Sequence, residues 1–263
     1  MRNLKLQING VAMNVLESSN VDCKSSIALV FLHYFGGSSR SWTEVITRLS
    51  STHCCIAPDL RGFGDSDSTP TGYSVAENAN DVAALIEALG LEKYVLIGHS
   101  MGGKIALAFA ARQPAGLQKL ILLAPSPPSP EPIDDATRAH LLSTHGTRQS
   151  AAQVIGKVSA RPLPGAVFER AVEDNLKTSV PAWRAWLESG SREDISSQMA
   201  SVAVPTSVVA GEKDEAMTPN LLSREVVARI PNASLVVVPD AAHLLPLEAP
   251  EEVAQILGRL LGA

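Results

Sequence analysis

The sequence has no long apolar run, and its clearest continuous stretches, such as residues 27–32, are far too short to span a bilayer. Residues 1–20 alternate polar and apolar side chains and lack the apolar core of a secretory signal. Three cysteines do not make a disulfide framework, and Cys54 and Cys55 are adjacent on a predicted buried strand. We therefore expect a cytoplasmic protein without a membrane partner, whose thiols act as small core residues.

Excess positive charge, metal-ligand spacing and a phosphate loop are also missing. A formal net charge of −5 gives no reason to expect a nucleic-acid partner. His33, His53 and His99 are scattered over different predicted elements and lack the spacing of metal ligands. No glycine-rich phosphate loop follows a predicted strand, because Gly62 and Gly64 lie in an Asp-rich loop. We expect neither a metal nor a cofactor.

What the 263 residues do contain is an alternation of short buried strands and amphipathic helices. Asn9-Gly10 between two alternating segments predicts a β-hairpin. Capping boxes beginning at Ser41 and Ser74 predict two helix starts. This rhythm favours an α/β fold: a mostly parallel, twisted sheet of about eight strands with helices on both faces. Buried strands are expected at residues 27–32, 53–57, 94–97, 117–123, 206–210 and 235–238.

The alternation of strands and helices stops between residues 126 and 198, where no buried strand is predicted. Helical pieces are expected there instead, at about 134–143, 150–158, 165–177 and 181–189. We interpret residues 1–125 and 199–263 as one core and residues 126–198 as a helical cap inserted over the site.

One stretch organises the rest of the chain. The predicted strand at 94–97 runs into Gly98-His99-Ser100-Met101-Gly102, and a helix follows to about residue 112. A Gly-x-Ser-x-Gly turn in this setting lifts the serine hydroxyl clear of the backbone at the end of a sheet. A Cβ two positions before or after the serine would collide with so tight a turn, which explains both glycines. We take Ser100 as the candidate nucleophile and expect strained backbone geometry there.

A serine hydroxyl needs an adjacent base, and the base needs a group that fixes its tautomer. The loops after strands 206–210 and 235–238 offer Asp214 and His243, at the same sheet edge as Ser100. The order Ser…Asp…His is the order that this elbow requires. We assign Ser100 as nucleophile, His243 as general base and then acid, and Asp214 as the orienting carboxylate. Other carboxylates compete for that last role: Glu212, Glu215 and Asp240.

The developing oxyanion needs backbone N–H donors. One is expected from Met101, which follows the nucleophile at the start of a helix. The other is expected from the loop at residues 33–37, with Phe35 as first choice and Tyr34 as runner-up. His99, although next to the nucleophile, is expected to point away from it and to pack in the structure.

These motifs together resemble the α/β-hydrolase fold family, and within it the small bacterial carboxylesterases, enol-lactonases, carbon–carbon bond hydrolases and cofactor-free haloperoxidases. In that family the residue two positions after the strand-end histidine supplies the second oxyanion N–H, which the resemblance implies for Phe35. A serine in place of the aspartate nucleophile of dehalogenases and epoxide hydrolases points to acyl transfer to water. The resemblance covers nearly all of the chain outside the predicted cap and rests on His33-x-Phe35-Gly-Gly, Asp59-Leu-Arg-Gly-Phe-Gly-Asp-Ser66, Gly98-His-Ser-Met-Gly-Gly103, Gly211-Glu-Lys-Asp214 and His243.

The resemblance implies a carboxylesterase: a serine hydrolase that cleaves small carboxylic esters through an acyl-enzyme intermediate. A lactonase with the same triad is the nearest alternative, because a lactone is an ester in a ring. A carbon–carbon hydrolase is less favoured, and haloperoxidase or perhydrolase chemistry would be a side reaction. A small-ligand receptor on a hydrolase scaffold is the alternative from a different class. The expected partner is a small ester or lactone, and the protein is expected to be a monomer or a homodimer.

The family usually has His-Gly where this chain has His33-Tyr34. Tyr34 must therefore fit a backbone path often taken by glycine, either by a different path or with strain. We expect its phenol to line the pocket and to hydrogen-bond a substrate oxygen. His33, Trp183 and Trp186 are further pocket candidates, although the two tryptophans could equally hold the cap together.

Overall fold

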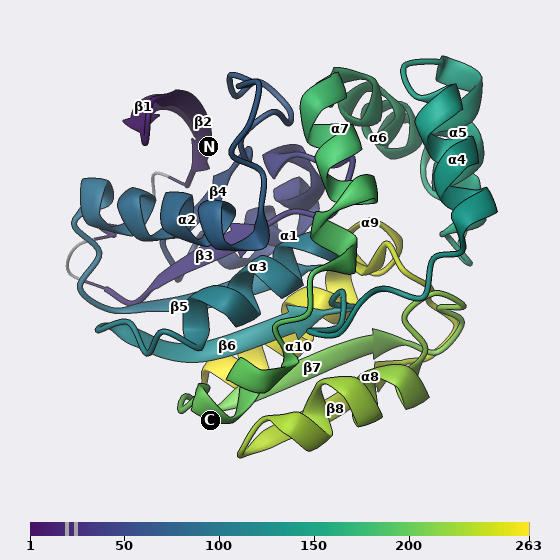
Figure 1. Ribbon diagram of the computed structural model, residues 1–263. Coiled ribbons are helices and arrows are strands. Elements are labelled where there is room, and N and C mark those ends of the chain that lie inside the picture. The colour runs from purple at the N-terminus through teal and green to yellow at the C-terminus, as the bar shows by residue number, and fades with distance from the viewer. Residues whose placement is uncertain (19–20, 24–25, 263) are drawn as a thin grey trace.

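The computed structural model describes residues 1–18, 21–23 and 26–262, and its centre is an eight-stranded sheet (Figure 1). The strand order is β1-β2-β4-β3-β5-β6-β7-β8. Every pairing from β4–β3 to β7–β8 is parallel, whereas β1–β2 and β2–β4 are antiparallel. The predicted α/β fold class is confirmed. The strands are β1 Arg2–Ile8, β2 Val11–Glu17, β3 Ala28–Leu32, β4 Cys55–Pro58, β5 Tyr94–His99, β6 Leu117–Leu123, β7 Thr206–Gly211 and β8 Ala233–Val238.

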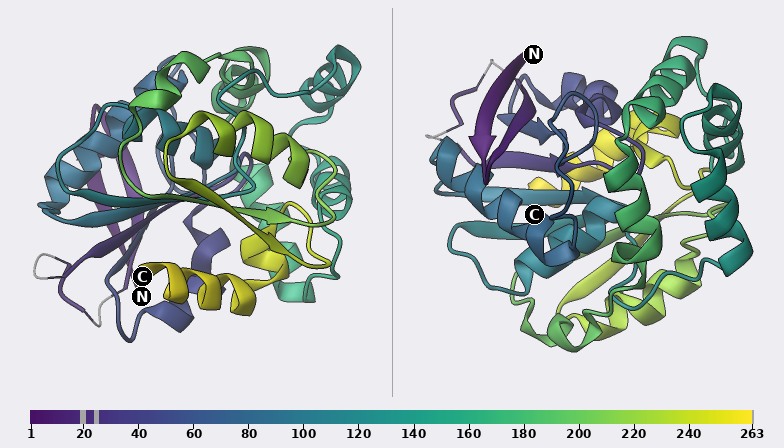
Figure 2. Two further views of the ribbon diagram at one scale, coloured as in Figure 1. Left: turned by 90° about the horizontal axis from the view of Figure 1, so that it is seen from below. Right: turned by 45° about the horizontal axis from the view of Figure 1, so that its top comes forward.

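Helices cover both faces of the sheet (Figure 2). Helices α1 and α10 pack against each other on one face, and α2, α3 and α8 lie on the other. None of the helices in the described ranges is long and apolar enough to cross a bilayer. The α-helices are α1 Thr43–Leu49, α2 Val75–Leu89, α3 Met101–Ala110, α4 Asp135–Thr144, α5 Arg148–Lys157, α6 Gly165–Lys177, α7 Val180–Glu188, α8 Pro219–Glu225, α9 Leu245–Glu248 and α10 Pro250–Leu261, and the 3₁₀ turns are η1 Ser39–Trp42, η2 Gly190–Arg192, η3 Ser196–Ser201 and η4 Val227–Arg229.

The structure contains the hairpin turn at Asn9-Gly10 and the capping box at Ser74 that the sequence predicts. The β1–β2 hairpin turns at Asn9 and Gly10, whose φ angles of 47° and 81° suit a tight two-residue turn. At the start of α2, Ser74 accepts the backbone N–H of Glu77, and Glu77 accepts the backbone N–H of Ser74. These reciprocal bonds satisfy donors that the helix leaves free.

The predicted capping box of Ser41 and Glu44 is wrong. Helix α1 begins at Thr43 behind Trp42, which makes no side-chain cap. Ser41 instead accepts the backbone N–H of Ser38 and completes a capping box for the 3₁₀ turn η1. Ser38 thus caps a 3₁₀ turn that comes before the helix. Ser41 lies inside this turn, and α1 starts only after it.

Helices α4 to α7 lie between β6 and β7, within a few residues of the four predicted helical pieces. We call them the inserted helices. They sit above the carboxyl ends of the strands (Figure 1). Ion pairs join α6 to the core segment around η1 and α1: Arg40 with Asp174, and Arg170 with Glu44 at 2.6 Å. That the inserted helices form a separate cap stays a prediction.

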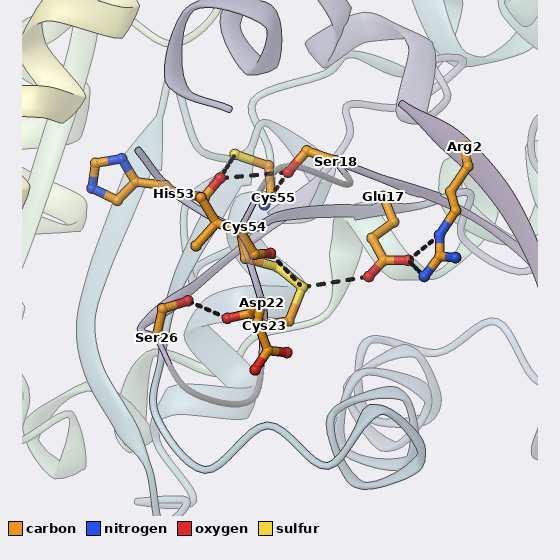
Figure 3. Close-up of a disulfide and its surroundings, with 10 residues drawn as sticks. Arg2, Glu17, Ser18, Asp22, Cys23, Ser26, His53, Cys54 and Cys55 are labelled. Atoms are coloured by element: carbon orange, nitrogen blue, oxygen red, sulfur yellow. Dashed lines mark hydrogen bonds and ion pairs between the residues drawn. A yellow bond between two sulfur atoms is a disulfide. The ribbon is translucent and has the colours of Figure 1, made fainter. Parts of the chain in front are cut away.

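Cys23 and Cys54 form a disulfide that ties the segment after β2 to the residue before β4 (Figure 3). The prediction that all three cysteines are thiols is therefore wrong for this pair. Because β2 pairs with β4, the chain beyond β2 returns past Cys54 and brings the two Cα atoms within 5.1 Å. Cys55 is a buried thiol, as expected, and burial raises its pKa to about 12. Disulfides are typical of oxidising compartments, so this bond does not support the predicted cytoplasmic location.

Removing the disulfide is expected to destabilise the protein. A link across a sequence separation of 31 restricts the unfolded chain, so Cys23→Ser should lower the free energy of unfolding by roughly 2–4 kcal/mol. Urea denaturation measures the change. Dithiothreitol should lower the midpoint of the wild type and leave that of Cys23→Ser unchanged. Equal midpoints for wild type and variant without reductant would contradict the bond.

Candidate active site

Ser100 forms the turn between β5 and α3 and has the strained backbone that the motif predicts. Its φ of 51° and ψ of −117° lie outside the ordinary regions for a residue with a side chain. A Cβ on Gly98 would lie 2.5 Å from the carbonyl oxygen of Gly102, and one on Gly102 would lie 2.6 Å from the carbonyl oxygens of Leu32 and His33. The expected collision at both glycines is confirmed.

The loops after β7 and β8 bring Asp214 and His243 to this turn. The Nε2 atom of His243 lies 2.9 Å from the hydroxyl oxygen of Ser100, and its Nδ1 atom lies 2.7 Å from Oδ2 of Asp214. Since the carboxylate can only accept, a neutral imidazole carries its proton on Nδ1 and leaves Nε2 to accept from the serine hydroxyl. The three residues predicted as a triad therefore form one hydrogen-bonded chain, and all three are buried.

Asp214 is the carboxylate that bonds to His243, and none of its three competitors takes that place. Its Oδ1 atom accepts the backbone N–H groups of Ala216 and Met217, both at 2.9 Å. These bonds hold the carboxylate toward His243. Glu212 instead accepts the backbone N–H of Asp240 at 3.1 Å on the exposed side of the loop. The side chains of the two remaining competitors, Glu215 and Asp240, are exposed.

In the pair of His243 and Asp214, both pKa values are shifted in the direction that favours the charged form of each residue. Burial alone lowers the pKa of His243, but the charge and hydrogen bond of Asp214 outweigh burial and raise it above its ordinary value of 6.5. Burial raises the pKa of Asp214, yet the nearby imidazole and the two backbone N–H groups hold it below its usual range. The carboxylate is therefore suited to stabilising an imidazolium that forms during a reaction.

The expected oxyanion donors lie where the loop at 33–37 meets the start of α3. Met101 begins α3, so its backbone N–H has no partner within the helix. Gly102 lies directly against the carbonyls of Leu32 and His33, which places that loop beside the nucleophile. The Phe35 N–H makes no hydrogen bond within the described ranges. Both donors are thus available, and their role stays a prediction.

His33 is fully buried and orders this loop. Its Nε2 accepts the backbone N–H of Leu60 at 3.0 Å, so its Nδ1 carries the proton and donates to the carbonyl of Tyr34 at 2.8 Å. Burial, as the largest effect, lowers its pKa. Because both nitrogens are used, His33 has none left for a substrate, and its assignment to the pocket is corrected to a structural role.

Tyr34 fits its position without a left-handed backbone, since it is absent from the residues of positive φ in the described chain. The ring is 5% exposed and packs with Ile155 and Val172 of the inserted helices and with Leu244. Its hydroxyl is buried without a hydrogen-bond partner among the described residues, and burial raises its pKa. A hydrogen bond from this phenol to a substrate stays a prediction.

Trp183 joins the inserted helices to the expected oxyanion loop. Its ring stacks on Phe35 at 4.3 Å on one side and on His145 at 4.2 Å on the other. Its Nε1–H donates to the carbonyl of Leu141 at 3.0 Å. Trp186 lies farther from Phe35, at 6.3 Å between ring centroids. Trp183 therefore holds the inserted helices together and borders the loop, and a place for it or for Trp186 in a substrate pocket stays a prediction.

His99 and Glu248 contact the loop that carries His243. His99 donates from Nε2 to the backbone carbonyl of His243 at 2.8 Å, and burial, as the largest effect, lowers its pKa to about 3. It points away from the nucleophile, as expected, but it also supports the base. Glu248 accepts backbone N–H groups on both sides of His243. Sequence reasoning missed Glu248, because nothing in its local pattern indicates where its carboxylate points.

Within residues 1–18, 21–23 and 26–262, no group of three or more His, Cys, Asp or Glu side chains could hold a metal ion. The groups that the site brings together are the serine hydroxyl, the imidazole, the carboxylate and the backbone donors.

Comparisons with known proteins identify a family for this chain. A family model described as the alpha/beta hydrolase family matches residues 29–256. A putative 2-succinyl-6-hydroxy-2,4-cyclohexadiene-1-carboxylate synthase of Bacillus subtilis strain 168 is 28% identical over 90% of this chain and 91% of its own length. A putative carbamate hydrolase of Caulobacter sp. strain K31 is 29% identical over 86% of this chain and 88% of its own length.

Solved structures show the same architecture. An esterase from Exiguobacterium antarcticum superposes with a TM-score of 0.89 at 21% identity and covers all of both chains. An enol-lactonase from Burkholderia xenovorans LB400 superposes with a TM-score of 0.85 at 21% identity, over 99% of this chain and 100% of its own. At these identities the likeness shows the fold.

Proposed function

Because the chain belongs to the alpha/beta hydrolase family, we propose that it is a carboxylesterase that cleaves small carboxylic esters through an acyl-enzyme intermediate. The observation that carries the proposal is the hydrogen-bonded chain from Ser100 through His243 to Asp214. Such a chain makes a serine hydroxyl nucleophilic near neutral pH.

In this proposal the oxygen of Ser100 attacks the acyl carbon while Nε2 of His243 takes the hydroxyl proton. The backbone N–H groups of Met101 and Phe35 bind the oxyanion of the tetrahedral intermediate. The intermediate collapses, the C–O bond to the alcohol breaks, and the alcohol leaves with the proton from His243. Water then attacks the acyl-enzyme with His243 again as base, which releases the acid and restores Ser100.

Two alternatives use the same site. A lactone would open by the identical steps, with the alcohol remaining attached to the acid. The relative described as a carbamate hydrolase favours a second class, in which the bond cleaved is C–N. The alternative from another class is a receptor that binds a small ligand without turning it over.

A panel of substrates separates these functions. We expect steady hydrolysis of p-nitrophenyl esters graded by acyl length, assayed beside lactones and carbamates of matched size. Preference for the lactones or the carbamates would select one of those alternatives. No turnover of any compound by folded protein, combined with saturable ligand binding, would contradict the enzyme and favour the receptor.

The pH dependence of kcat/KM follows from the pKa of His243. The base works only as neutral imidazole, so activity is lost as pH falls through this pKa. Because the Asp214 carboxylate outweighs burial and raises the pKa, half-maximal kcat/KM on the acid side should lie above about pH 6.5. Initial rates with p-nitrophenyl acetate across the pH range measure this midpoint. A midpoint below the ordinary histidine value would show that the carboxylate does not dominate.

A further inference from the structure

Glu248, at the end of α9, places its carboxylate among backbone donors from two distant segments. The residue is 8% exposed. Its Oε1 accepts the N–H of Leu244 at 2.9 Å, and its Oε2 accepts the N–H of Ala242 at 3.1 Å. Its Oε2 also accepts the N–H groups of Ala160 and Arg161, at 2.8 and 3.0 Å. Both oxygens are therefore occupied as acceptors.

The four donors surround the residue that carries the base. Ala242 and Leu244 are the two neighbours of His243 in the chain. Ala160 and Arg161 follow α5 of the inserted helices, and the N–H of His243 itself donates to the carbonyl of Val158 in the same segment at 3.1 Å. One buried carboxylate thus fixes the loop around His243 and fastens it to the inserted segment.

We propose that Glu248 is a positioning residue for His243, which sets the orientation of the base through the backbone on either side of it. The inference rests on the proposed function, since His243 is the base of that reaction. A misplacement of a catalytic group by about 1 Å can cost roughly 100-fold in rate, so a loop held at both flanks of the base has a direct effect on kcat.

The charge of Glu248 gives the inference a second observable. The groups that face His243 are the carboxylates of Asp214, Glu131 and Glu248 and the imidazole of His99. Burial lowers the pKa of His243, and the three carboxylates raise it. Removing the charge of Glu248 should therefore lower the pKa of His243, whereas a loss of stability alone would not move it.

Glu248→Gln is the variant that tests the role. An amide offers one acceptor oxygen, so either orientation turns an NH₂ group toward the backbone N–H of Ala242 or of Leu244. With p-nitrophenyl acetate we expect kcat to fall by roughly 10- to 100-fold while KM changes little. The acid midpoint of kcat should move to lower pH. Glu248→Asp, which keeps the charge and both acceptors, should retain the wild-type midpoint.

Glu252→Gln is the matched control. Glu252 lies four residues farther along the chain, in α10, and accepts a hydrogen bond from the side chain of Arg161 at 2.8 Å. Glu252→Gln removes a nearby carboxylate but keeps the hydrogen bonds that Glu248 accepts from the loop of His243. We therefore expect kcat and the acid midpoint to stay unchanged. Equal kcat and midpoint in wild type and Glu248→Gln would overturn the positioning role, as would equal effects of the two glutamine variants.

NMR titration of His243 separates this proposal from the proposed function. The ring signals of His243 should titrate at lower pH in Glu248→Gln than in wild type, whether or not any ester is hydrolysed. A lowered pKa in a protein that turns over no substrate would leave the positioning intact and reject the esterase. If Glu248→Gln does not fold, Glu248→Asp decides. Its side chain is one methylene shorter, so kcat should fall while the midpoint keeps its wild-type value, and a wild-type kcat in this variant would overturn the inference.

Discussion

Ser100→Ala is expected to abolish turnover and to lower kcat for p-nitrophenyl acetate by roughly 10⁴- to 10⁶-fold. The variant keeps the imidazole and the backbone donors but has no oxygen to attack the acyl carbon. Without that oxygen no acyl-enzyme can form, so the initial burst of p-nitrophenol should disappear together with the steady rate. Stopped-flow absorbance measures both phases.

The strained backbone at Ser100 is formed by the turn and not by the hydroxyl, so the alanine variant should fold with an unchanged melting temperature. Ser223→Ala, on the exposed face of α8, provides a control that removes a hydroxyl outside the triad. Retention of even a tenth of the wild-type rate by Ser100→Ala, confirmed as free of contaminating esterase, would reject Ser100 as the nucleophile.

Asp214→Asn is expected to lower kcat by roughly 10⁴-fold, although it changes only one atom of the side chain. Its oxygen must accept the N–H groups of Ala216 and Met217, which turns the new NH₂ group toward Nδ1 of His243. Nδ1 then has to accept, so the ring proton moves to Nε2 and faces the hydroxyl of Ser100. In that tautomer the imidazole cannot take the serine proton.

The pH profile checks this explanation. Loss of the Asp214 charge removes the main cause of the raised pKa of His243, so the acid midpoint should fall together with kcat. Glu215→Gln and Asp240→Asn change carboxylates that competed with Asp214 for the orienting role in the sequence, and both should retain wild-type rates. A large loss in either control, with Asp214→Asn unaffected, would move the orienting role to that residue.

The triad could be predicted because its parts depend on local chemistry and on topology. The glycines around Ser100 leave room for one tight turn, because a Cβ at Gly98 or Gly102 would collide with backbone carbonyl oxygens. Parallel strands end at the same edge, so residues after β7 and β8 had to approach Ser100. Choosing Asp214 among its neighbours required only that its position in the loop allow it to reach the histidine.

Features that depend on distant backbone could not be predicted. The bond between Cys23 and Cys54 depends on how β2 pairs with β4, and that pairing is not visible in the spacing of the cysteines. His33 appeared available to a substrate, yet the N–H of Leu60 occupies one of its nitrogens. Glu248 gave no signal, because its donors come from two segments, at residues 160–161 and 242–244, that only tertiary packing unites.

The stack of Phe35 on Trp183 has a consequence for mutagenesis of the inserted helices. The buried indole packs directly on the ring of Phe35, whose amide is expected to bind the oxyanion. A change in α7 that displaces Trp183 would therefore also disturb this donor. Such a change would lower kcat through the oxyanion site even if α7 makes no contact with the substrate.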